Sequence, residues 1–135
     1  MTYIPDSLRR FVRERAGYKC EYCLLKEEFT IKRHEIDHII AEKHGGETLA
    51  SNLCLCCHDC NLHKGSDLSS IDPLTLKGEF LFNPRLDNWS EHFQLKGALI
   101  VPLTAAGRVT TQLLRFNDTN RVMERNILVS LGVYP

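Results

Sequence analysis

The sequence has no long apolar segment, no excess of either charge, and a single tryptophan among its 135 residues. No run of about 18 apolar residues occurs, so no membrane-spanning helix is predicted. The first residues, MTYIPDSLRRFVRER, become charged within nine positions, which is not typical of a secretory signal peptide. We therefore expect a cytoplasmic protein that does not enter a membrane.

The balance of charge limits the expected partners. Lysine and arginine number 17 and aspartate and glutamate also number 17, so the formal net charge is zero. Proteins that bind nucleic acid usually carry a basic excess or a basic patch. Any nucleic-acid contact in this protein must therefore depend on local charge.

Apolar spacing and turn residues predict the elements. Leu8, Phe11 and Val12 recur at helical spacing, which predicts a helix over 5–15 that Gly17 ends. Strand-favouring isoleucines predict a strand or hairpin over 29–40, and a polar loop over 41–52 follows. We then expect a strand over 53–56, a short helix over 57–64, a turn region over 66–73, strands within 76–102, and two helices, from Thr104 to about Phe116 and from Asp118 to about Leu131.

The six cysteines are unevenly spaced. Two Cys-x-x-Cys pairs, Cys20/Cys23 and Cys57/Cys60, match the tetrahedral thiolate set that structural Zn²⁺ prefers. Cys54 and Cys56 alternate with leucines in a predicted strand, so they are expected to be buried as small apolar residues. The alternatives are six reduced core thiols, or His58 as a substitute ligand.

The segment between the two pairs is longer than a zinc ribbon needs. It holds 33 residues, against about 15–20 in a minimal ribbon. Within or just after it come Asp37-His38-Ile, Gly45-Gly46, Asn52-Leu and Cys60-Asn61-x-x-Lys64-Gly65. In this order the motifs resemble the HNH endonuclease family, in its bacterial form with a ββα-metal fold and two zinc knuckles.

The resemblance implies a nuclease in which Asn52 fastens the central loop and orients His38. Asp37 and Asn61 stand where other members have histidine, and both offer oxygen ligands, which suit Mg²⁺ or Mn²⁺. The same roles follow from chemistry. His38 can take a proton from water near neutral pH, while Asp37 and Asn61 hold a divalent cation at the phosphate. Glu35 is a weaker candidate for a supporting carboxylate.

Adjacent strand residues point to opposite faces, so Asp37 and His38 are expected at a distorted strand end, with the metal on one side and water on the other. His63 is a further candidate metal ligand, and its alternative is an exposed helix position. The residues predicted to contact nucleic acid are Lys64, Arg9, Arg10, Arg13 and Lys43. The alternative for the arginines is an ordinary solvated helix face.

The prediction is thus an α+β protein with a ββα-metal core held by a Cys₄ zinc site. We expect one domain over 1–135: an N-terminal helix (1–19), the zinc-bound core (20–66) and a C-terminal strand-helix-helix extension (67–135). The expected activity is metal-dependent hydrolysis of DNA phosphodiesters, with zinc as structural and Mg²⁺ or Mn²⁺ as catalytic cofactor. RNA as substrate and the oligomeric state are left open. The alternatives are a catalytically inactive zinc-knuckle module that binds nucleic acid, and a structural interaction protein.

Overall fold

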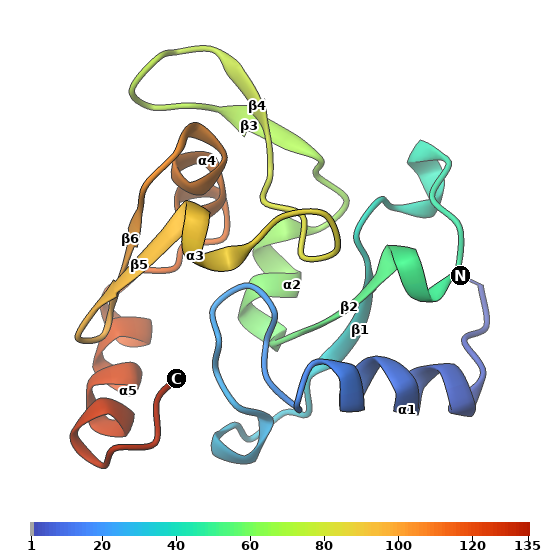
Figure 1. Ribbon diagram of the computed structural model, residues 1–135, viewed down its shortest axis with the longest axis horizontal. Helices are drawn as coiled ribbons and strands as arrows, with labels where there is room; N and C mark the ends of the chain where they lie inside the picture. The colour runs from blue at the N-terminus through green and yellow to red at the C-terminus, as the bar shows by residue number, and fades with distance from the viewer. Residues whose placement is uncertain (1) are drawn as a thin grey trace.

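The computed structural model describes residues 2–135, and these form an α+β fold with three two-stranded antiparallel sheets (Figure 1). The helix α1 and the β1–β2 hairpin lie on one side of α2, and the C-terminal strands and helices lie on the other (Figure 1). The fold class predicted from the sequence is confirmed. None of the helices within residues 2–135 is both long and apolar enough to cross a membrane.

The helix α1 (Asp6–Arg15) forms where it was predicted. Pro5 precedes its first turn and Gly17 follows it with a φ of 63°, a left-handed conformation that favours glycine. Val12 is buried and Leu8 packs beside it against the leucines of β2. Phe11, expected on the same apolar face, is half exposed and lies under the guanidinium of Arg15.

The strands β1 (Glu35–His38) and β2 (Leu53–Cys56) pair antiparallel over their full length, from Glu35 opposite Cys56 to His38 opposite Leu53. Leu53 and Leu55 face α1, whereas Cys54 and Cys56 enter the other core cluster. The burial of these two cysteines is therefore as predicted. The helix α2 (His58–Lys64) follows β2 directly, with Cys57 at its N-cap and Gly65 at its end.

The strand predicted over 29–40 is shorter than expected, because only residues 35–38 are extended and paired. Glu27–Phe29 is a 3₁₀ turn, and Ile31 is fully exposed. The carboxylate of Glu27 accepts a hydrogen bond from the backbone N–H of His34, at 2.7 Å. Local polar bonds therefore hold this segment in a turn, in spite of its strand-favouring residues.

The C-terminal part is richer in elements than its sequence suggested. The region 66–73, predicted as a turn, contains β3 (Ser69–Ile71), which pairs with β4 (Gly78–Phe80). Arg108 binds both carboxylate oxygens of Asp72 at 2.9 Å, lowers the pKa of that carboxyl group, and anchors the hairpin. The remaining elements are α3 (Trp89–His92), β5 (Phe93–Lys96), β6 (Leu99–Pro102), α4 (Ala105–Leu113) and α5 (Thr119–Ser130).

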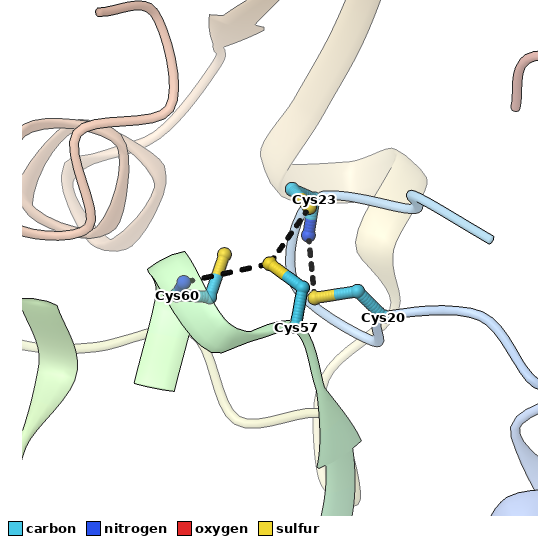
Figure 2. Close-up of side chains that lie close together, drawn as sticks. All are labelled: Cys20, Cys23, Cys57 and Cys60. Atoms are coloured by element: carbon cyan, nitrogen blue, oxygen red, sulfur yellow. Dashed lines mark hydrogen bonds between the residues drawn. The ribbon is translucent and has the colours of Figure 1, made fainter. Parts of the chain in front are cut away.

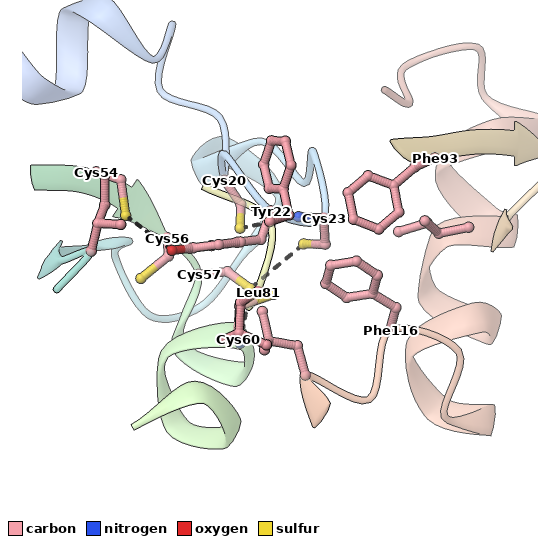
Figure 3. Close-up of a cluster of buried hydrophobic side chains, with 14 of the residues drawn as sticks. Cys20, Tyr22, Cys23, Cys54, Cys56, Cys57, Cys60, Leu81, Phe93 and Phe116 are labelled. Carbon is pink, nitrogen blue, oxygen red and sulfur yellow. Dashed lines mark hydrogen bonds between the residues drawn. The ribbon is translucent and has the colours of Figure 1, made fainter. Parts of the chain in front are cut away.

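One apolar cluster joins the cysteine pairs to the C-terminal part (Figure 3). Tyr22, from the first pair, meets the ring of Phe82 edge-on, and Phe82 in turn packs on Phe93. The indole N–H of Trp89 donates to the carbonyl of Tyr22 at 2.8 Å, and Arg85 pairs with Glu21. Trp89 and Arg85 thus pack the extension against the core.

Candidate functional site

The four cysteines of the two Cys-x-x-Cys pairs converge in a buried cluster (Figure 2). All four Sγ atoms lie within 4.8 Å of one another, and within the described residues no other group of three or more Cys, His, Asp or Glu side chains converges in this way. In each pair the backbone N–H of the second cysteine donates to the first sulfur at 3.4 Å. The donor set and its geometry fit a tetrahedral Zn²⁺.

The ionisation of these thiols also requires a cation. Burial raises the pKa of the Cys60 thiol, and hydrogen bonding with Cys20 raises that of Cys57. Hydrogen bonding with Cys20 lowers the pKa of Cys23. Thiolates this close repel one another, so all four ionise together only when a metal ion compensates their charge.

Part of that compensation comes from α5. The guanidinium of Arg121 is buried and lies 3.1 Å from Cys60 Sγ and 3.8 Å from Cys57 Sγ. Burial alone would lower the pKa of Arg121, but the neighbouring thiolates outweigh it and raise the pKa. Its other bonds, to the carbonyls of Leu114 and Arg115, fix the guanidinium in place.

The side chain of Asn52 fastens the loop between β1 and β2. The side chain of Asn52 accepts a hydrogen bond from the N–H of Ile40 and donates to the carbonyls of Ile40 and Glu47, all at 2.9–3.0 Å. Gly46 lies so close that a Cβ there would stand 1.7 Å from the Ile40 oxygen and 2.9 Å from the Asn52 amide. This close approach explains the second glycine of the Gly45-Gly46 pair.

His38 ends β1 with its ring directed at this loop. Its Nε2 lies 2.9 Å from the hydroxyl of Thr48 and 3.5 Å from the carboxylate of Glu42, and the Thr48 hydroxyl lies 3.4 Å from the same carboxylate. A proton on Nε2 can donate to Thr48, which can donate to Glu42. This network favours the tautomer in which Nδ1 carries the free lone pair.

Asp37 lies on the opposite face of β1, toward α2. Its Oδ2 accepts a bond from the ammonium group of Lys64 at 2.9 Å, and the same ammonium donates to the carbonyl of His38 at 3.2 Å. Lys64 is only 2% exposed. Lys64 was predicted to contact nucleic acid. That role stays a prediction, and it requires the ion pair between Lys64 and Asp37 to open.

Asn61, on α2, points its amide nitrogen at Glu35 instead of pairing with Asp37. Glu35 also lies 3.1 Å from Nδ1 of His58, which is therefore placed at β1 and not in the cysteine cluster. Among residues 2–135, no side chain hydrogen-bonds to Oδ1 of Asp37 or of Asn61. The oxygen donors predicted for a divalent cation are thus available, and their chemistry fits Mg²⁺ or Mn²⁺.

The remaining predicted residues are dispersed. Lys43 is exposed on the loop and Arg10 on α1, while His63 is partly buried on α2. Arg9 donates to the carbonyl of Ile4, and Arg13 binds Glu27 and the carbonyl of His34. Both arginines are therefore engaged within the molecule, and only Arg10 is exposed among the three predicted on α1.

Sequence reasoning missed Thr48, Glu42 and Arg121. Thr48 and Glu42 lie in the polar loop, where no spacing rule distinguishes a histidine partner from a solvated side chain. Arg121 is 61 residues from Cys60 in the sequence. The sequence carries no signal for this role, because the positions around Arg121 on the predicted helix do not indicate that it is buried.

Comparison with known proteins agrees with this geometry. Residues 20–67 match the family model described as HNH endonuclease. The chain is 24% identical over 118 residues to the Septu protein PtuB of Bacillus thuringiensis, and the alignment covers 86% of this chain and 43% of the relative. This chain thus spans less than half the length of that relative. No solved structure matches the chain.

The matched segment contains both cysteine pairs, the β1–β2 hairpin and α2, which together give the ββα arrangement with its zinc-type cluster. The sequence match and the fold thus agree on the same residues. Residues 20–67 of this chain form a domain of the HNH endonuclease family.

Proposed function

We propose that this protein is a metal-dependent endonuclease that hydrolyses phosphodiester bonds of DNA. The proposal rests on the spatial arrangement of the polar residues in this domain. His38 ends β1 beside the loop that Asn52 fastens, and Asp37 and Asn61 present oxygen atoms on the face of β1 toward α2. This is the set of groups that phosphodiester hydrolysis needs.

In the proposed reaction, Nδ1 of His38 takes the proton of the attacking water. The bonds through Thr48 to Glu42 hold the ring and stabilise the positive charge that it gains. Asp37 and Asn61 would hold the divalent ion, which when bound supplies charge neutralisation at the phosphate and at the leaving oxygen. Asn52 keeps the loop, and with it Thr48, in position.

The four cysteines are proposed to hold zinc in a structural role. All four ligand positions are filled by protein sulfur, which leaves no open position for substrate. We further propose that residues 1–135 act as a single domain, since one apolar cluster includes residues from the cysteine pairs and the C-terminal extension. The cytoplasm is the proposed location, because the six cysteines, all within the described residues, form no disulfide, as expected in a reducing compartment.

A plasmid assay tests the activity. The protein should nick supercoiled DNA with Mg²⁺ or Mn²⁺ and stop when EDTA is added. His38→Ala should lower the rate about 100-fold or more, because general base catalysis is lost. His44→Ala is the matched control, since His44 is exposed on the same loop, and it should cut at the parental rate. Equal rates for His38→Ala and the parent would contradict the proposed mechanism.

The second candidate is a module that binds nucleic acid without cutting it. The ion pair between Lys64 and Asp37 favours it, because a neutralised carboxylate is a poorer metal ligand. This candidate predicts that the protein retards DNA in a gel-shift assay but does not nick the plasmid with any divalent ion. The same preparation therefore distinguishes the two functions.

A further inference from the structure

A cavity of about 260 Å³ opens next to the candidate catalytic residues. Its floor is buried and comes from two parts of the chain: Ile39 and Lys64 belong to the HNH domain, and Leu81 and Phe82 follow β4. Lys64 lines the cavity and also contacts the candidate catalytic residues, since its ammonium group binds Asp37 and the carbonyl of His38. A substrate held at Asp37 would therefore lie next to this cavity.

The rim of the cavity carries apolar side chains with no cover from the rest of the molecule. Phe80 is 74% exposed, and Leu86 and Ile40 also line the opening as exposed residues. An exposed aromatic ring beside a nucleic-acid site offers a surface on which a base can stack. Apolar contact area of this kind excludes a hydrated phosphate as the occupant.

The polar groups of the cavity lead to the same occupant. Besides Lys64, which is paired, the charged residues are the carboxylates Asp67 and Asp87, and Asn83 adds an amide. Carboxylates repel phosphate and accept hydrogen bonds from amino groups. The exocyclic amino groups of adenine, cytosine and guanine meet this requirement, and thymine lacks such a group.

We propose that this cavity is a subsite for one unpaired nucleobase, adjacent to the phosphodiester that the enzyme cuts. The inference rests on the proposed function, because it assumes that nucleic acid occupies the site at His38. The base stacks on Phe80 and its amino group faces the carboxylates. A base inside a duplex cannot reach such a pocket without leaving the stack, so the subsite favours single-stranded or unpaired nucleotides.

The test compares two exposed apolar residues of the same hairpin. Phe80 lines the cavity, whereas Leu74, at the turn and 71% exposed, does not. Each is changed to alanine in a His38→Ala background, so that the probe, a fluorescently labelled single-stranded oligonucleotide of mixed sequence, stays intact. Phe80→Ala should weaken binding about tenfold through the loss of one stacking contact, and Leu74→Ala should bind like its background.

A second measurement keeps the proposal testable if Phe80→Ala does not fold. Leu86→Ala removes another rim side chain that is 82% exposed, and it should weaken binding in the same direction. Oligonucleotides with one abasic position, moved along the strand, should lose affinity at a single place next to the mapped cut.

The outcomes separate this subsite from the proposed function. If the parent cuts and binds DNA but Phe80→Ala, Leu86→Ala and Leu74→Ala all bind alike, the subsite is wrong and the nuclease assignment stands. Uniform loss across all abasic positions also overturns the subsite. A parent that neither binds nor cuts nucleic acid overturns both.

Discussion

At the scale of single residues, the setting of His38 is the most informative. Strand alternation implied that Asp37 and His38 face opposite sides, and a distorted strand end was expected to reconcile them. The pairing in fact stays regular through His38, opposite Leu53. The two side chains are therefore served by different partners: Lys64 on the α2 side, and Thr48 with Glu42 on the loop side.

The first prediction concerns Thr48 as a positioning residue. Thr48→Val removes the hydroxyl that hydrogen-bonds to His38 and should lower kcat about tenfold, because the ring loses one of the contacts that orient it. Steady-state rates measure this effect.

Thr48→Ser is the control for this prediction, since it keeps the hydroxyl and should recover most of the activity. If Thr48→Val and Thr48→Ser are equally impaired, the hydroxyl does not position His38 and Thr48 only fills space. The sequence could point to His38 because His38 belongs to a series of motifs that occur in the order expected for the family. It could not point to Thr48, because a threonine in a polar loop is ordinary.

At the scale of elements, α5 has a role that its own sequence does not reveal. Arg121 and Arg125 lie one turn apart, and both are buried. Arg125 donates to the carbonyls of Ala98 and Phe116, whereas Arg121 donates to the sulfur of Cys60. One helix thus supplies a structural arginine and an arginine directed at the metal-type cluster.

The second prediction uses this pair as a matched comparison. Arg121→Met should weaken zinc retention about 10- to 100-fold, because the thiolates lose the buried positive charge that partners them. Arg125→Met should destabilise the fold without a comparable change in zinc affinity. Competition with a chromogenic chelator gives the affinity, and thermal unfolding gives the stability. Equal zinc loss in both variants would show that Arg121 acts only through packing.

At the scale of the whole molecule, the C-terminal extension and the HNH domain share one core. Trp89 donates to the carbonyl of Tyr22, and Tyr134, next to the last residue, donates to the carbonyl of Cys23 at 2.7 Å. Both contacts end on the first cysteine pair. A change at the first cysteine pair is therefore expected to alter the packing of the C-terminal extension.

The third prediction follows from these contacts. Since Trp89 is the single tryptophan, its fluorescence reports the packing of the extension on the first cysteine pair. Mild EDTA treatment should abolish cleavage and leave the fluorescence unchanged. A thiol-specific mercurial, which displaces zinc from the cysteines, should shift the fluorescence and lower the unfolding temperature. Fluorescence that is insensitive to the mercurial would mean that the cluster does not hold the two parts together.

The sequence alone determined the α+β class, which four cysteines cluster, and the order of Asp37, His38, Asn52 and Asn61, because short-range spacing encodes strands, knuckles and caps. It did not determine the length of the first strand, where side-chain bonds from Glu27 to the backbone outweighed the preference of the isoleucines. Nor did it reveal the partners of the motif residues. The bonds of Thr48 to His38, Lys64 to Asp37 and Arg121 to Cys60 join positions 10, 27 and 61 residues apart. Such contacts depend on which surfaces meet when the elements pack, and only the tertiary structure decides that.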